Sequence, residues 1–193
     1  PYSGIQGYNI SPDGRWITYS TQAENQVRIV YLYNVADNIA YPVTTPWYDS
    51  YSSIFSDDGK YLFFTSSRDF RATYSRVEWN VSYNVSSYVF VLPLAKDTPD
   101  PTAVKAVEFK PAEEGKTSPT TAPSKKSDKN DKAPNDSKKP TEVKIDLDGI
   151  VERASALPLE AGMYQLMASI DDDLYFWTRM EVKKISLRDM KVT

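Results

Sequence analysis

The 193-residue sequence contains neither cysteine nor histidine. The absence of cysteine excludes disulfide bonds and thiolate metal sites. The absence of histidine removes the commonest general base and the commonest metal ligand, so a Ser-His-Asp triad cannot be built from this chain. Acidic pairs such as Asp57 and Asp58 fall in predicted turns, where carboxylates mostly cap backbone groups. We therefore expect no catalytic residue, no metal and no cofactor in this chain.

Long apolar runs and a strong excess of one charge are also missing. The longest apolar segment, Tyr88–Ala95, is too short to span a bilayer and contains a proline. The 23 basic and 26 acidic residues give a formal net charge of −3, which provides no reason to expect nucleic acid or an anionic membrane as a partner. The segment that begins at Pro1 has no charged start followed by an apolar run, so we expect no signal peptide in it.

One stretch, residues 111–140, lacks Val, Ile, Leu, Met, Phe, Trp and Tyr altogether. Its seven lysines and five acidic residues nearly balance. Such a composition buries too little apolar area to offset the entropy of an ordered chain, so we expect a long disordered polar insertion. The simple interpretation is a solvated loop inserted in a sheet, and the alternative is an electrostatic tether to a cell-envelope partner.

A short motif is present twice, as Ser11-Pro12-Asp13-Gly14 and as Ser56-Asp57-Asp58-Gly59, with an offset of 45 residues. A basic residue and an aromatic-rich apolar segment follow each copy. Proline at the second position presets φ for a type I turn, and the glycine supplies the left-handed residue after it. A tight turn before such a strand, recurring at about 40–45 residues, is typical of β-propeller blades.

The sequence thus predicts an all-β fold, a partial β-propeller of about three four-stranded blades. We place the blades at about 7–44, 51–157 and 162–193, with the polar insertion inside the second. Propellers close with about 4–8 blades, so we expect a fragment of a longer protein. Large aromatic side chains are expected to fill the gaps between blades: Trp16, Tyr19, Tyr31, Tyr33, Phe63, Phe64, Tyr175, Phe176 and Trp177.

An aromatic and basic excursion, residues 67–84, interrupts the second blade between two strand-like segments. The link between the second and third strands of a blade lies at the same end as the link into its inner strand. Arginines there suit a peptide carboxylate or main chain, and aromatic residues suit peptide side chains. The alternative is that the excursion only packs on a neighbouring part of the protein. The candidate peptide-binding residues are Arg68, Arg71, Tyr74, Arg76, Trp79 and Tyr83.

Three parts of the chain carry a resemblance to a known family. The segment Ser11–Ser20 resembles the blade repeat of TolB and tricorn protease propellers. Segments 67–99 and 144–158, including Val91–Leu94 and Lys144–Ile150, resemble the tricorn-like serine peptidases of bacteria. The chain is therefore similar to the N-terminal TolB/tricorn-type propeller region of that family.

The resemblance implies a non-catalytic propeller that filters or guides unfolded peptides to a distant serine-histidine centre. It implies as partners a peptide or unfolded protein substrate, and the remaining propeller, PDZ and catalytic domains of a parent serine peptidase. A homo-oligomer is compatible with it. An exported or periplasmic bacterial location is favoured, with the cytoplasm as the alternative.

Two other functions fit the same fold. One is a TolB-like protein-interaction module without peptidase activity. The other is the propeller of a prolyl-oligopeptidase-type enzyme, which a Gly-x-Ser-x-Gly elbow further along the parent chain would identify.

Overall fold

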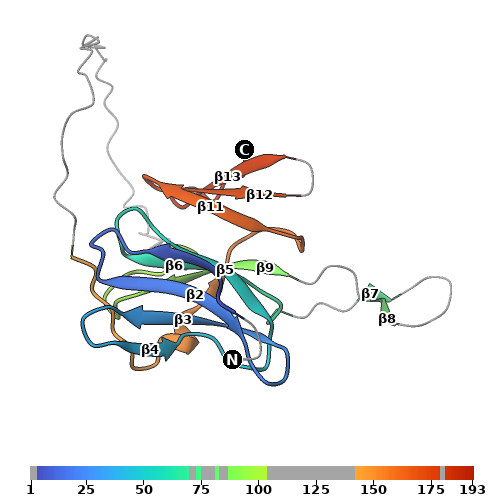
Figure 1. Cartoon of the computed structure of the whole chain (residues 1–193). Coiled ribbons are helices and arrows are strands. Elements are labelled where there is room, and N and C mark those ends of the chain that lie inside the picture. Colours follow the sequence, from blue (N-terminus) through green and yellow to red (C-terminus); the bar gives the residue numbers. More distant parts are fainter. Residues whose placement is uncertain (1–3, 70–72, 75–80, 83–86, 104–141, 179–180) are drawn as a thin grey trace, which may run out of the picture. The chain divides into compact units, whose positions relative to one another are not determined.

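The computed structural model describes residues 4–69, 73–74, 81–82, 87–103, 142–178 and 181–193 of the chain, so the polar insertion lies outside the described residues. In the described part the protein consists of antiparallel strands with one short 3-10 helix, η1 (Ile150–Arg153), and no α-helix. Three sheets of three or four strands follow one another along the chain (Figure 1). The predicted all-β, partial-propeller fold is therefore confirmed.

Each sheet is a meander that starts from its inner strand. The first contains β1 (Gln6–Ile10), β2 (Trp16–Gln22), β3 (Arg28–Asn34) and β4 (Ile39–Pro42) in that order. The second contains β5 (Ser50–Phe55), β6 (Tyr61–Ser66), β9 (Tyr88–Pro93) and β10 (Ser155–Ala156). The third contains β11 (Gln165–Ile170), β12 (Asp173–Trp177) and β13 (Val182–Ser186). A separate two-stranded pair, β7 (Thr73–Tyr74) and β8 (Val81–Ser82), lies within the excursion.

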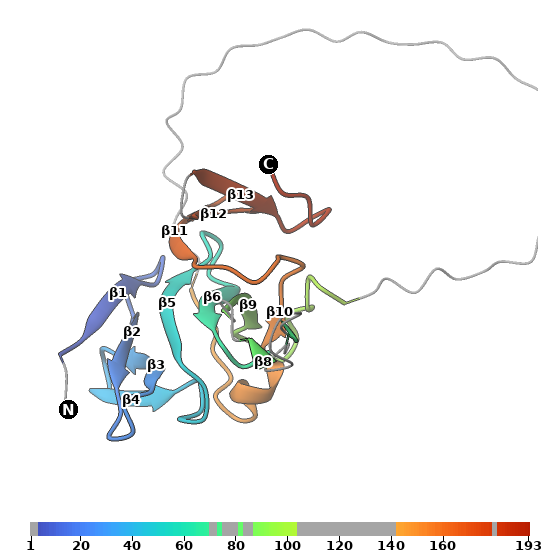
Figure 2. The ribbon, with the colours of Figure 1, turned by 90° about the vertical axis from the view of Figure 1, so that its right-hand side faces the viewer.

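The second sheet is buried on both faces. Side chains of a strand alternate between faces, and those of β6 and β9 divide accordingly between two apolar clusters. Leu62 and Phe64 pack toward Val30 and Leu32 of the first sheet. Phe63, one residue along, packs toward the third sheet. Phe63 and Phe64 have no exposed surface, so the middle sheet carries the core for both neighbours, with β5 between the first sheet and β11 (Figure 2).

The two copies of the repeated turn make the same hydrogen bonds. In the first, the Gly14 N–H donates to the Ser11 carbonyl at 2.9 Å, and the Ser11 hydroxyl donates to Asp13 Oδ1 at 2.6 Å. In the second, the Gly59 N–H donates to the Ser56 carbonyl at 3.0 Å. Its serine hydroxyl likewise donates to the second aspartate, at 2.7 Å. The serine hydroxyl also accepts the N–H of the first strand residue in both copies, at 2.9 Å.

A segment that follows the insertion joins these two turns. The Val143 N–H donates to Asp13 Oδ2 at 2.8 Å, and Arg15 pairs with Glu142. The Val143 side chain lies so close to Gly59 that an added Cβ would come within 2.6 Å of its Cγ2 atom. Residues 142–143 therefore fasten the first sheet to the second.

In the outer part of the second sheet, residues 144–150 do not lead directly into the edge strand. The Asp146 N–H donates to the Leu94 carbonyl, but the chain then turns at Gly149, whose φ is 65°. η1 follows, and only Ser155 and Ala156 pair with β9. The left-handed glycine starts the helix and ends the extended run, so the fourth strand is shortened to two residues.

Candidate functional site

The first two strands of each sheet are antiparallel, so the inner strand begins at the end of the sheet where the second strand finishes. We call this end of each sheet the entry end. In the second sheet the register aligns Ser50 with Ser66, and Ser66 with Tyr88. The excursion between β6 and β9 therefore leaves and re-enters the sheet at its entry end. In the first sheet, Gln6 pairs with Ser20 in the same way.

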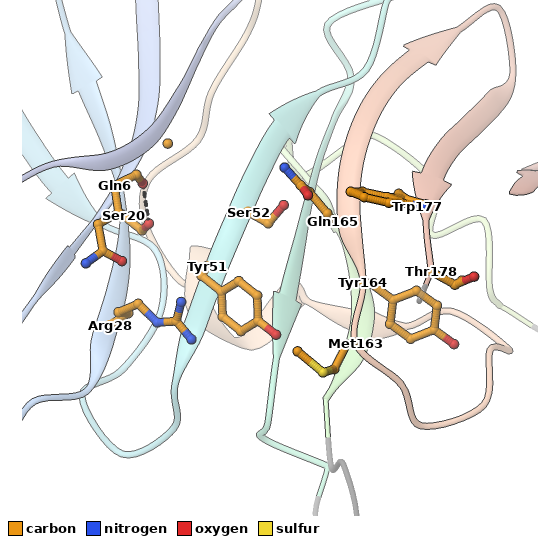
Figure 3. Close-up of a pocket in the computed structure, with 11 residues that line it drawn as sticks. Gln6, Ser20, Arg28, Tyr51, Ser52, Met163, Tyr164, Gln165, Trp177 and Thr178 are labelled. Atoms are coloured by element: carbon orange, nitrogen blue, oxygen red, sulfur yellow. Dashed lines mark hydrogen bonds between the residues drawn. The ribbon is translucent and has the colours of Figure 1, made fainter. Parts of the chain in front are cut away.

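A cavity of about 600 Å³, the entry-end cavity, lies at this end, and all three sheets contribute to its wall. Gln6 and Tyr51 stand near the starts of the inner strands β1 and β5, and Trp177 ends β12. Figure 3 shows the side chains arranged around the cavity from the three sheets. Its lining residues are Gln6, Gly7, Ser20, Arg28, Tyr51, Ser52, Met163, Tyr164, Gln165, Trp177 and Thr178.

The inner strands bulge where they reach the cavity. Gly7, with a φ of 62°, and Ser52, with a φ of 53°, occupy equivalent places 45 residues apart, and the pairing of each strand shifts there. The pairing of β11 shifts between Leu166 and Ala168. A bulge bends a strand and redirects its side chains. The Ser52 hydroxyl is turned toward the third sheet, where it accepts the Leu166 N–H at 3.0 Å.

Arg28 lines the cavity and is held in place by an ion pair with Asp49. The Arg28 guanidinium donates from Nε to Asp49 Oδ1 at 2.9 Å and from its Nη2 to the other carboxylate oxygen. The guanidinium carbon lies 3.8 Å from the centre of the Tyr51 ring, a cation-π contact. Figure 3 shows the Arg28 side chain extending toward that ring. The wall thus has a planar cation held between a carboxylate and an aromatic face.

The charges of this pair are fixed by their contact. Hydrogen bonding to Asp49 raises the pKa of Arg28 and outweighs the opposing effect of burial. Burial by itself raises the pKa of Asp49, but hydrogen bonds from the side chain and backbone of Arg28 more than compensate, so the carboxyl pKa lies below its ordinary value. Both groups are therefore charged at neutral pH, and the positive charge of Arg28 is compensated where it stands.

A second, more polar cavity of about 410 Å³ adjoins the first. The two share Gln6 and Arg28. The second cavity is rich in carboxamides, and its lining residues are Gln6, Gln22, Asn25, Gln26, Val27, Arg28 and Asp49. Carboxamides offer both donors and acceptors, which is what a peptide main chain requires.

Of the six residues that the sequence analysis selected, only Arg68 has a described side chain. Its guanidinium carbon lies 5.4 Å from the centre of the Phe90 ring of the second sheet, and it does not line the cavity. Tyr74 lies in β7, but its side chain is not among those described. Arg71, Arg76, Trp79 and Tyr83 lie outside the described residues.

The residues that line the cavity were not among those predicted from the sequence. Trp177 was expected to belong to the packing between blades, but it is 50% exposed and lies beside Gln165 at the cavity (Figure 3). Met163 is 57% exposed. The 45-residue repeat contained a usable signal, because it relates Gly7 to Ser52 and so marks the bulged positions of two inner strands.

Two further features of the described residues bear on the kind of site. None of the helices in the described part has the length and apolar character needed to cross a membrane. Within the same residues, no group of three or more acidic side chains is arranged to hold a metal ion. Asp146 and Asp148, which stand together in the sequence, both contact Lys96.

Comparison with known proteins identifies the family. The family described as "Tricorn protease second beta propeller domain" matches residues 1–189. The chain belongs to the tricorn protease second β-propeller family. This membership confirms the resemblance stated from Ser11–Ser20 and from the 67–99 and 144–158 segments.

Curated relatives agree with this membership. Tricorn protease homolog 1 of Streptomyces coelicolor is 27% identical over 173 residues, which cover 90% of this chain and 15% of that protein. Putative tricorn protease homolog 2 of the same organism is 23% identical over 182 residues, 92% of this chain and 14% of the relative. Tricorn protease of Thermoplasma acidophilum is 28% identical over 104 residues, 51% of this chain and 10% of the relative. The chain thus spans about 15% of the length of the Streptomyces relatives.

Solved structures show the same fold. A crystal structure of the tricorn protease superposes on 98% of this chain with a TM-score of 0.67 and 20% sequence identity, and the match covers 18% of that protein. The three sheets described above therefore correspond to part of a tricorn propeller.

Proposed function

We propose that this chain is the non-catalytic propeller part of a tricorn-like serine peptidase, and that it guides unfolded peptides to a distant catalytic domain. The observation that carries the proposal is the family match over residues 1–189, because it ties this fold to a protease. The sequence has no histidine, so a serine-histidine centre has to come from another part of the parent protein. The proposed partners are the peptide substrate and the remaining propeller, PDZ and catalytic domains.

The organisation into blades is part of the proposal. The first sheet corresponds to a blade at 7–44, the second to a blade at 51–157 that contains the insertion 111–140, and the third to a blade at 162–193. The entry-end cavity supports a role in peptide contact, because it combines apolar walls with carboxamides at the end where the inner strands begin. Extended chains with free main-chain groups and accessible apolar side chains fit such a surface, whereas a folded domain buries most of its apolar side chains and pairs its main-chain groups.

The test is peptide cleavage by the full-length parent, compared with this chain alone. Substrates are an unfolded protein, its folded form and a short chromogenic peptide, each with and without a serine-directed inhibitor. The proposal expects inhibitor-sensitive cleavage of the unfolded protein and the short peptide by the parent, little cleavage of the folded protein, and none by this chain. A parent that cleaves nothing would favour the TolB-like interaction module. Cleavage by this chain alone would contradict the proposal.

A further inference from the structure

We infer that the entry-end cavity is a binding subsite for one uncharged apolar side chain, preferably aromatic, of an extended peptide. The adjoining main chain of that peptide crosses Gln6 and Arg28 into the amide-rich second cavity. This inference rests on the proposed function and names what the site selects.

The first argument is the exposure of large apolar groups at the cavity. Met163 is 57% and Trp177 50% exposed, whereas the core aromatics Phe63 and Phe64 are completely covered. A thioether and an indole at the lip of a cavity of about 600 Å³ offer a flexible apolar contact and a flat aromatic face. Covering them with an apolar side chain removes that surface from water.

The charge at the cavity favours a neutral side chain. Among the described residues that line the cavity, Arg28 is the single charged one. Asp49 already accepts two hydrogen bonds from the Arg28 guanidinium. An incoming carboxylate would have to compete with Asp49, and an incoming ammonium would meet the guanidinium. A neutral side chain meets neither cost, so the cavity selects against charge.

The third argument is the supply of hydrogen bonds for a main chain. Gln6 and Gln165 both line the cavity, and their side-chain amides make no hydrogen bond to the described residues. Each offers one acceptor and two donors. Successive side chains of an extended peptide point to opposite sides, so a peptide that inserts one apolar side chain presents its main-chain groups to these amides on either side of it.

The experiment measures binding of labelled peptides to the full-length parent, with its peptidase activity blocked by a serine-directed inhibitor. The probes are three 12-residue peptides of Gly, Ser and Gln that differ only at a central Phe, Asp or Lys. Fluorescence anisotropy gives the Kd of each. The inference expects the Phe peptide to bind at least about tenfold more tightly than the Asp and Lys peptides.

Substitutions of methionine locate the subsite. Met163→Glu places a charge at the cavity lip and is expected to weaken binding of the Phe peptide at least about tenfold, while Met163→Leu keeps it. Met167→Glu is the matched control. Met167 lies in β11, four residues after Met163, and is similarly exposed at 55%, but it does not line the cavity. This control is expected to bind the Phe peptide as the unsubstituted protein does. Melting temperatures of all variants check that the fold is intact.

Equal affinity for the Phe, Asp and Lys peptides would overturn the inference, and so would equal weakening by Met163→Glu and Met167→Glu. These outcomes are separate from the failure of the proposed function. A parent without inhibitor-sensitive cleavage contradicts the peptidase role, but the Phe preference and its loss in Met163→Glu remain measurable in the same protein without any turnover.

Discussion

At the scale of single residues, the two repeated turns serve as controls for each other. Gly14 and Gly59 have nearly equal φ values of 72° and 69°, so a side chain meets the same backbone strain at both. They differ in surroundings. Nothing lies within 4 Å of a Cβ added at Gly14, whereas at Gly59 it would come within 2.6 Å of the Val143 side chain.

We therefore expect Gly14→Ala to lower the free energy of unfolding by about 1 kcal/mol. Gly59→Ala adds a steric clash and is expected to lower it by about 2–4 kcal/mol. Urea unfolding of the two variants measures the difference. Adding Val143→Ala to Gly59→Ala should recover part of the loss, and equal losses at the two glycines would contradict the close contact.

Asp58 makes the second turn sensitive to acid. Burial raises the pKa of its carboxyl, but hydrogen bonds from Lys60 and Ser56 lower that pKa by more than burial raises it. The folded-state pKa therefore lies below the ordinary value of 3.8. A depressed pKa means that the charged carboxylate stabilises the fold at all pH values above the unfolded pKa. That stabilisation is lost as the pH falls below about 4 and through the folded pKa.

Asp58→Asn is expected to reduce the acid dependence of unfolding below about pH 4 without removing it. Asp13 in the first turn has a lowered pKa from the same arrangement and still titrates. The measurement is the free energy of unfolding from pH 7 downward. Asp57→Asn is the matched control, because the Asp57 side chain is exposed and makes no hydrogen bond to the described residues. If both variants change the pH profile alike, Asp58 does not have this role.

At the scale of strands, β6 is the element on which both neighbouring sheets depend. Phe63 and Phe64 are adjacent in sequence but belong to different apolar clusters. Phe63→Ala and Phe64→Ala are each expected to cost about 3–5 kcal/mol. Tyr19→Ala, in the half-buried second strand of the first sheet, should cost clearly less, because its ring stacks on Tyr31 outside these clusters. Thermal unfolding of the three variants measures these losses of stability. A larger loss for Tyr19→Ala than for the two phenylalanine variants would contradict the central role of β6.

The strands themselves were largely readable from the sequence. The aromatic-rich apolar segments after the two repeated turns form β2 and β6, and the longest apolar segment, Tyr88–Ala95, contains β9. The apolar runs of β6 and β9 are continuous because a strand between two packed faces needs apolar side chains on both. The shortened β10 was not readable, since it depends on the left-handed turn at Gly149 and on the hydrogen bonds that Asp146 and Arg153 donate to the Leu94 carbonyl.

The cavity was much less accessible to sequence reasoning. Arg28, Tyr51 and Trp177 lie on three different sheets, and no spacing along the chain connects them. The concentrated arginines and aromatic residues of 67–84 were the stronger signal in the sequence. Nothing in the residues next to Arg28 marks it as part of a site. Only the fold shows that Asp49 neutralises its charge beside the ring of Tyr51.

At the scale of the whole molecule, the described strands on both sides of the insertion belong to one compact unit. The flanks of the insertion are fastened within the first unit, where Ser155 donates to Asp100 and Val143 donates to Asp13. We expect that a flexible linker of about 12 residues can replace 104–139 with a change in unfolding free energy below about 0.5 kcal/mol. Urea unfolding of the shortened chain measures this. A loss above about 2 kcal/mol would show that the insertion contributes to the core.

The fastening of the two turns by Val143 has a consequence for synthesis. The ribosome makes both turns and three strands of the second sheet before residue 103, but Val143, Ile150 and β10 arrive only when about 50 more residues have been added. At about 5–20 residues per second, this interval lasts roughly 3–10 s. The notch at Gly59 is empty until Val143 arrives, and the outer edge of β9 has no partner strand until β10 arrives. The nascent chain therefore passes through a period in which an apolar sheet edge is open to chaperones or to a second nascent chain, and it ends when residue 156 leaves the exit tunnel.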